Sequence, residues 1–589
     1  GHNNVSIGYS SMRDKHGSRN VTTGSMSLQL NNSGDDNTSI GYYSMYNTTG
    51  SKNVSIGSKS LPVSNTDDNI SVGFESQNKS TDASGNTSLG TRSLKENVLG
   101  NHNVAIGYES QKSYNGEPDS HNTSLGYKTL QINTAGKFNT AIGHESLANL
   151  ESTNYNTSVG CNSLYNNKGQ LNNSFGSNSL YSNQQGTDNI SFGSYSSYEN
   201  VSGIENLSIG NNSLYNNKSS YNMAIGHNSQ FYNQNGENNI TMGCNSLFTS
   251  TNTHNSIAIG FKSQENIPLD TSANISIGSY TLQKSRAGQH DNIAIGNESM
   301  KEKMYGHKNI SIGSYSYYGN FDNGSRWYGD SNTAIGYESM YDTSSNFSIA
   351  IGDKTLKQSN TDSNIAIGHE SQIVNTDGSG NISIGHKTLH ENQIGDQNIA
   401  IGYQSQNKNT SNFNTSVGHE TLHNNETGDS NTAIGRKSLF KQTIGVSNTA
   451  VGRDTLYSNL SGQRNSAFGH GSLYDNIDGY DNIAYGYETL FNNTTGYSNT
   501  ALGNFSQHEA TEGIHNVGVG FHSLYTNIEG NENVAIGTYS QKFNLGDYNT
   551  SLGNQSLFLN TTGSRNTAVG YNALYNNKIG TNNVSIGSN

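Results

Sequence analysis

One stretch of the chain carries residue types suited to binding a sugar or a protein partner. A glycine of a repeated motif recurs about every 17 residues along the chain. Two successive copies of this glycine, Gly313 and Gly336, are 23 residues apart. Aromatic side chains exposed in such an insertion can stack on sugars or anchor a partner. We favour the simpler interpretation that the loop packs on its own coil, but it is the best single candidate for a binding site. The candidate residues are Tyr317, Tyr318, Phe321, Arg326, Trp327 and Tyr328.

Residue groupings typical of catalysis or metal binding are absent from the sequence. His369 and His386 occupy the same position in consecutive repeats, so we expect them ~5 Å apart. A metal site needs more ligands than two histidines. We find no Ser/His/Asp grouping, phosphate-binding loop, Cys/His cluster or calcium-binding glycine-rich repeat. The sequence therefore predicts no catalytic, cofactor-binding or metal-binding residues, and no enzyme.

The two cysteines, Cys161 and Cys244, are five repeats apart. At ~4.8 Å per repeat they would lie roughly 24 Å apart, whereas a disulfide needs Cα atoms within ~7 Å. We expect two outward-facing thiols, and the alternative is a link between chains.

These residues are positioned by one repeat that is copied from Gly8 to Gly587. Its consensus is Asn-(Val/Ile/Thr)-(Ser/Ala)-(Ile/Val/Leu)-Gly-x-x-(Ser/Thr)-(Leu/Gln/Met), and we call its glycine the motif glycine. We count 35 copies with a mean step of about 17 residues. Regular repeats of this length are typical of solenoids, in which each unit packs only on its neighbours. The prediction is an all-β parallel β-solenoid, a β-roll of about 35 coils, that forms one continuous domain over residues 1–589.

Each coil is expected to contain short strands joined by tight corners. The residues three and one before the motif glycine are apolar or Thr, as in Ile293 and Ile295, except for Asn173 and Ser466. This spacing places both on one face of a strand. We predict that this face points inward, with the Leu four past the glycine as a second core residue. The small residue between the two would face a neighbouring wall or a partner chain. The Ser or Thr three past the glycine should hold the corner through hydrogen bonds to the backbone.

Composition narrows the class of protein. Apolar residues make up 30% and charged residues 13%, with a net charge of −13. The strict spacing of the apolar residues argues against disorder. We see no basic stripe for nucleic acid, no apolar run of the ~20 residues that span a bilayer, and no signal peptide. The chain begins and ends inside a repeat, so we expect an internal segment of a longer polypeptide.

An asparagine lies four residues before the motif glycine in 33 of the 35 copies, with Ser256 and Ser348 as the exceptions. Stacked in register, these asparagines would form a ladder of amides from coil to coil. Many also read as glycosylation sequons, such as Asn69-Ile70-Ser71. We favour the ladder as the reason for the asparagine and treat the sequon as its by-product.

The string from Asn101 to Ser110, Asn-His-Asn-Val-Ala-Ile-Gly-Tyr-Glu-Ser, resembles the head repeats of trimeric autotransporter adhesins of the YadA type. Related repeats occur in phage and large-virus tail fibres. The resemblance implies a left-handed parallel β-roll, three chains side by side, and binding to host matrix or cells. It would make Val104 and Ile106 core residues, Ala105 a residue near a chain interface and Ser110 a corner residue. The repeat here is longer than in those heads, and no coiled-coil stalk or membrane barrel is visible.

These observations predict a structural and adhesive extracellular fibre, the shaft or head of a surface adhesin. The alternatives are a phage or giant-virus tail or capsid fibre, and a self-polymerising filament or matrix protein. The expected partners are further copies of the chain, as a homotrimer or filament, and a host-cell, matrix or glycan receptor. The expected location is the cell or virion surface. An ice-binding role would need a flat array of Thr or similar residues on one face, and the position after the motif glycine is too mixed to supply it.

Overall fold

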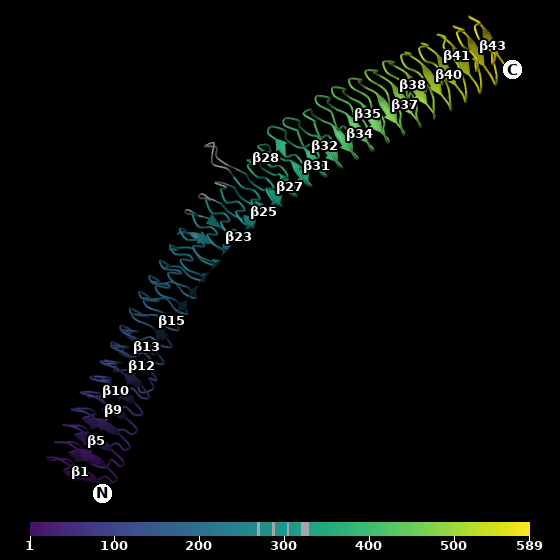
Figure 1. Cartoon of the computed structure of the whole chain (residues 1–589). Coiled ribbons are helices and arrows are strands. Elements are labelled where there is room, and N and C mark those ends of the chain that lie inside the picture. The colour runs from purple at the N-terminus through teal and green to yellow at the C-terminus, as the bar shows by residue number, and fades with distance from the viewer. Residues whose placement is uncertain (268–270, 285–288, 303–305, 320–328) are drawn as a thin grey trace. The chain divides into compact units, whose positions relative to one another are not determined.

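The structure is a computed structural model that describes residues 1–267, 271–284, 289–302, 306–319 and 329–589. The chain is an all-β parallel β-solenoid of about 33 turns with about 17 residues per turn, as the repeat predicts. It divides into a first unit, Gly1–Ala294, and a second unit, Ile295–Asn589. Within each unit the strands of successive coils lie side by side, as Figure 1 shows.

Each motif copy forms one three-residue strand. In the first unit these strands are β1 (Val5–Ile7), β3 (Val21–Thr23), β5 (Thr38–Ile40), β7 (Val54–Ile56), β9 (Ile70–Val72), β10 (Thr87–Leu89), β11 (Val104–Ile106), β12 (Thr123–Leu125), β13 (Thr140–Ile142), β14 (Thr157–Val159), β15 (Asn173–Phe175), β16 (Ile190–Phe192), β17 (Leu207–Ile209), β18 (Met223–Ile225), β19 (Ile240–Met242), β21 (Ile257–Ile259) and β23 (Ile275–Ile277). Strand β24 (Ile293–Ile295) contains the boundary between the units.

In the second unit they are β25 (Ile310–Ile312), β26 (Thr333–Ile335), β27 (Ile349–Ile351), β29 (Ile365–Ile367), β31 (Ile382–Ile384), β32 (Ile399–Ile401), β33 (Thr415–Val417), β34 (Thr432–Ile434), β35 (Thr449–Val451), β36 (Ser466–Phe468), β37 (Ile483–Tyr485), β38 (Thr500–Leu502), β39 (Val517–Val519), β40 (Val534–Ile536), β41 (Thr550–Leu552), β42 (Thr567–Val569) and β43 (Val584–Ile586). Two-residue strands occur in some of the turns: β2 (Asp14–Lys15), β4 (Leu30–Asn31), β6 (Asn47–Thr48), β8 (Val63–Ser64), β20 (Thr253–His254), β22 (Thr271–Ser272), β28 (Gln358–Ser359) and β30 (Val374–Asn375).

Neighbouring strands pair in parallel and in register, so that equivalent residues of the repeat face each other. In the second unit Thr432 pairs with Thr449 and Ala433 with Ala450. The first unit follows the same rule, with Ser88 opposite Ala105. Each side-chain position therefore forms a column that runs along the stack of coils.

The direction in which the strands face is opposite to the one predicted. In β34 the small residue, Ala433, is fully buried, while Thr432 is half-buried and Ile434 is 40% exposed. Strand β11, in the copy that resembles the adhesin repeats, faces the same way: Ala105 is buried, and its neighbours Val104 and Ile106 are partly exposed. The small residue is thus the core residue, and the larger apolar residues cover the outside of the sheet.

The reason is the narrow interior of the coil. Alternation along a strand defines two faces but does not say which of them is inside. Here the corner residues fill the interior: Ser438 donates a hydrogen bond to the carbonyl oxygen of Ala450 at 3.0 Å, so only Ala, Ser, Thr or Gly fits opposite. The predicted corner bond occurs in other copies, as where the Thr388 hydroxyl donates to the carbonyl oxygen of Gly385 at 3.2 Å. The Leu four past the glycine is also buried as predicted, and Leu439 and Leu456 pack with Ala450 in one core cluster.

The motif glycine is needed both for its backbone angle and for its close contact with the next coil. Gly435 has φ of +124°, and a Cβ atom built on it would lie 2.4 Å from the carbonyl oxygen of Gly452. Side chains are rarely tolerated at such an angle, and the neighbouring atom belongs to the backbone and cannot move aside. The column of glycines therefore lets successive coils approach closely at this corner.

The predicted asparagine ladder is confirmed. The backbone N–H of Asn465 donates to Oδ1 of Asn448 at 3.0 Å, and Oδ1 of Asn465 accepts from the N–H of Asn482 at 3.0 Å. The Asn465 Nδ2 atom also donates to the carbonyl oxygen of Gly479 at 2.7 Å. The ladder asparagines are fully buried in the interior of each unit, and a glycan on them is incompatible with that burial.

Replacing Asn465 by Ala should weaken its own coil and the next. The Asn482 N–H would lose its acceptor inside the protein, and a buried unsatisfied group costs about 1–3 kcal/mol. We expect the Asn482 amide to exchange its hydrogen roughly 5- to 150-fold faster, as measured by hydrogen–deuterium exchange. Asn492→Ala, at a half-buried asparagine outside the ladder, is the control. Unchanged exchange at Asn482 in Asn465→Ala would contradict the structural role of the ladder.

Candidate functional site

The most extensive feature of the surface is an apolar sheet face on each unit. We define the sheet face as the residues three and one before each motif glycine, which lie on the three-residue strands. The residue one before the glycine is apolar in every copy except at Thr23, whereas the residue three before it is Thr in many copies. In the second unit Ile434 is 40% exposed, and the side chain of Leu552 is 48% exposed. Aromatic members stack along the same columns, with ring centroids of Phe468 and Tyr485 4.4 Å apart. Contiguous exposed apolar patches are rare on monomeric soluble proteins and mark surfaces that contact something else.

The predicted aromatic site is only partly within the described residues. Phe321, Arg326, Trp327 and Tyr328 lie outside them. Tyr317 and Tyr318 follow β25 and have different environments, because Tyr317 is fully buried and Tyr318 is half-buried. The binding role proposed for this group remains a prediction.

Tyr317 takes the place of the consensus Leu in the core. Its hydroxyl accepts a hydrogen bond from Nδ2 of Asn332 at 2.7 Å and donates to the carbonyl oxygen of Ser345 at 3.4 Å. Gly329 leaves room for the longer side chain, since a Cβ there would lie 2.0 Å from the Tyr317 hydroxyl. Burial raises the pKa of the Tyr317 phenol well above its usual value. This side chain therefore supports the coil from inside.

Tyr318 is accessible and stacks on Tyr341 of the next coil, with ring centroids 5.1 Å apart and planes within 7° of parallel. Partial burial, followed by the nearby carboxylates of Glu302 and Glu298, raises the pKa of the Tyr318 phenol to about 12. Because the folded pKa is above the unfolded value of about 10, its contribution to stability is present below pH 10 and is lost toward pH 12.

Substitutions at the two tyrosines should separate support of the coil from surface contact. Tyr317→Ala leaves a cavity, which costs about 3–5 kcal/mol for a large aromatic residue, whereas Tyr318→Ala loses mainly a ring stack worth about 0.5–1.5 kcal/mol. We expect hydrogen exchange at the amides of Ser331 and Thr333, which bond to neighbouring coils, to accelerate far more in the first variant. Equal acceleration in both variants would contradict the core position of Tyr317.

The two histidines are adjacent, as the repeat predicts. The rings of His369 and His386 stack with centroids 5.2 Å apart, and the column continues through Tyr403 to His419. The Nε2 atom of His369 lies 3.5 Å from Oδ2 of Asp353. Within the described residues, no three His, Cys, Asp or Glu side chains are placed so that they could hold a metal ion. Cys161 and Cys244 are free thiols.

Two columns of rings were missed by the sequence analysis. They lie five residues past the motif glycine, next to the buried Leu. Their rings stack face to face between coils, except that Phe231 and Phe248 are tilted by 39°. The first-unit ring column comprises Tyr165, Tyr181, Tyr198, Tyr215, Phe231 and Phe248. The second-unit ring column comprises His423, Phe440, Tyr457, Tyr474, Phe491, His508 and Tyr525. The recurrence of aromatic residues at one position of the repeat could have revealed them.

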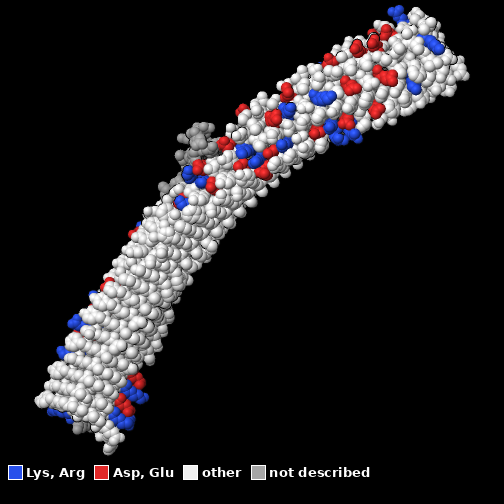
Figure 2. All heavy atoms as spheres, viewed as in Figure 1, with Lys and Arg blue, Asp and Glu red and all other residues white. Residues whose placement is uncertain are grey.

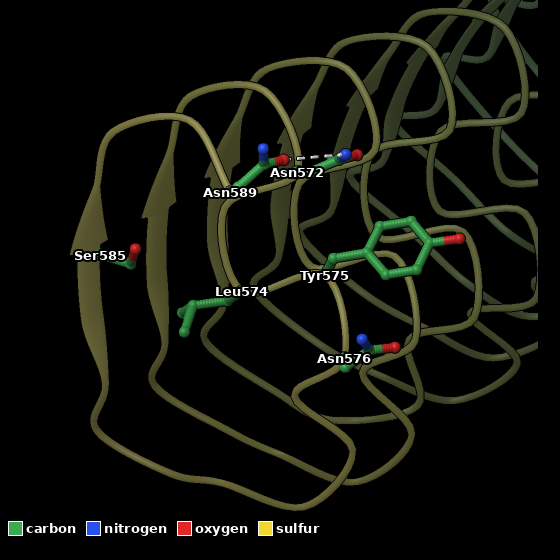
Figure 3. A pocket seen from close by; sticks show the side chains of 6 residues that line it. All are labelled: Asn572, Leu574, Tyr575, Asn576, Ser585 and Asn589. Atoms are coloured by element: carbon green, nitrogen blue, oxygen red, sulfur yellow. Dashed lines mark hydrogen bonds between the residues drawn. The ribbon is translucent and has the colours of Figure 1, made fainter.

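Two hollows of the surface are open to solvent and are lined mostly by polar residues. One of about 480 Å³ is lined by Leu574 and Ser585, which occupy core positions of the repeat, and by Asn572 and Asn589, whose side chains bond to each other at 3.2 Å (Figure 3). It lies beside β43, which contributes Ser585 to its lining. Another, of about 560 Å³, lies over the turns and includes Lys408.

No model of a known protein family matches the chain, and no curated protein matches it. Within the described residues, no helix is both long and apolar enough to span a bilayer.

Proposed function

We propose that the chain is a non-enzymatic, structural and adhesive element of an extracellular fibre at a cell or virion surface. In this proposal, copies of the chain associate side by side through the sheet face. The observation that carries the proposal is the exposure of apolar residues on coil after coil of each unit, including Ile384, Ile434 and Leu502 in the second unit.

A second copy of the chain suits this face because it offers the same columns with the same spacing between coils. Burial of apolar surface is worth roughly 25 cal/mol per Å². If each coil of a unit buries roughly 50 Å² of apolar surface, the sum over a unit is about 21 kcal/mol, which exceeds the about 4–15 kcal/mol that association costs in lost freedom. The homotrimer implied by the resemblance to adhesin heads is the arrangement we propose.

Charges on the sheet face should prevent this association. We predict that the chain carrying Ile384→Lys, Ile434→Lys, Leu502→Lys and Ile536→Lys is monomeric, because each new ammonium group would have to be buried at the interface. The measurement is the molar mass from sedimentation equilibrium, compared with that of the unaltered chain, for which we expect a multiple of the 63.4 kDa chain mass.

A matched control places the same charges on the turns. Ile394, Ile444, Ile477 and Ile528 are exposed apolar residues of the second unit outside the sheet face. Their replacement by Lys should leave the association intact. An unaltered chain that stays monomeric at micromolar concentration, or equal dissociation of both variants, would refute the sheet face as the interface.

A further inference from the structure

The first-unit ring column presents hydroxyl groups at a regular spacing. The rings of Tyr165, Tyr181, Tyr198 and Tyr215 follow one another with centroids 5.1 to 5.2 Å apart. Because their faces cover each other, the half-buried rings turn their edges outward. None of these four phenol hydroxyls forms a hydrogen bond with another of the described residues. Phenols are protonated donors at neutral pH, and burial raises the pKa of Tyr181 and Tyr215 further.

A column of asparagine amides lies in the same coils, two residues past the motif glycine. It comprises Asn162, Asn178, Asn212, Asn228 and Asn245, with Tyr195 in the remaining coil. Nδ2 of Asn212 donates to Oδ1 of Asn228 at 3.2 Å, and Nδ2 of Asn228 donates to Oδ1 of Asn245 at 3.1 Å. Tyr195 lies beside Tyr198, with ring centroids 5.5 Å apart, so the two columns are adjacent. Each coil therefore supplies a ring edge together with an amide or a second ring.

This face carries few charges. Residues 152–261 include only six charged side chains: Lys168, Asp188, Glu199, Glu205, Lys218 and Glu237. Of these, only Glu199 directly follows a member of the ring column. In Figure 2 the middle of the first unit is correspondingly almost free of colour on the side shown. With so few charged side chains, this face would not attract an anionic ligand or form ion pairs with a charged one.

We propose that the first-unit ring column and the adjacent asparagine column bind an uncharged linear polysaccharide that runs along the coils. The ligand should be repetitive because its site repeats once per coil. The spacing of sugar residues along an extended chain is comparable to the spacing between coils. It should be rich in hydroxyl groups because amides and phenols both donate and accept hydrogen bonds. Tyrosine adds a large, rigid and amphipathic contact area at low cost in conformational entropy, as it does in antibody binding sites. This site is separate from the sheet face and does not depend on association of the chain.

The second-unit ring column has similar stacking but a charged setting, which makes it a matched control. Lys437 lies 3.5 Å from Glu420, Nε2 of His508 lies 3.4 Å from Glu488, and the ammonium group of Lys441 lies 5.2 Å from the ring centroid of Tyr457. Its tyrosine pair, Tyr457 and Tyr474, stacks with centroids 5.0 Å apart. Loss of these two rings removes the same kind of contact at the same position of the repeat, but from the second unit.

The test is affinity electrophoresis of the full chain through gels that contain a soluble β-glucan, a mannan, a galactomannan or, as the anionic comparison, alginate. We expect at least one neutral polysaccharide to retard the chain and alginate not to do so. Tyr181→Ala with Tyr198→Ala should weaken binding at least tenfold, whereas Tyr457→Ala with Tyr474→Ala should leave it unchanged. Tyr181→Phe with Tyr198→Phe keeps the ring stack, removes two hydroxyls and should give an intermediate loss.

Three results would overturn the proposal. They are retardation by none of the neutral polysaccharides, stronger retardation by alginate, and equal weakening by the alanine pairs of the two columns. Circular dichroism of each variant shows whether the coils persist. If the alanine pair in the first unit unfolds them, the phenylalanine pair decides, and binding equal to that of the unaltered chain refutes a role for the hydroxyls. Sedimentation of the same samples reports association separately, so loss of sugar binding is distinguishable from loss of the fibre interface.

Discussion

The close spacing of successive coils, which parallel strand pairing fixes and the motif glycines permit, is the constraint on which the other features of each unit depend. At Gly435 and Gly452 the backbones approach so closely that no Cβ atom fits between them. At this separation equivalent residues of neighbouring coils fall opposite each other. The asparagine ladder, the buried hydroxyls and the stacked rings all use that one distance. One spacing, shared by the coils within each unit, thus explains why so many positions of the repeat are restricted at once.

The same closeness makes each coil thin, and this reverses the usual distribution of residue sizes. In most domains large apolar side chains fill the core, but here the strand contributes only Ala, Ser, Thr or Gly to the interior, and Leu enters from the corner. Polar groups share that interior: the side chain of Gln507 is fully buried and donates to the carbonyl oxygen of Thr500 at 2.9 Å. The larger apolar residues of the strands remain outside, which is why the sheet face exists.

The repeat alone was enough to predict the parallel β-solenoid, the buried Leu, the corner hydroxyl and the asparagine ladder, because each follows from periodicity and residue type. It did not predict the orientation of the strands, since alternation at Thr432, Ala433 and Ile434 is equally consistent with either face inside. The role of Tyr317 depends on the space left by Gly329, a tertiary contact. Left-handed backbone angles at non-glycine residues, such as φ of +55° at Lys437, were also not foreseen. They cost about 1–2 kcal/mol each in isolation and require the stack to enforce them.

Each coil contacts chiefly the one before it and the one after it. A single repeat is therefore a segment that recombination can add or remove. Removal or duplication of the segment between two equivalent glycines, such as Gly435 and Gly452, would join coils whose facing residues are of the same types. Unequal recombination between copies could therefore lengthen or shorten a unit without disturbing the ladders at the new junction. The number of coils is then free to drift or to be selected, while the cross-section of the coil is held nearly constant.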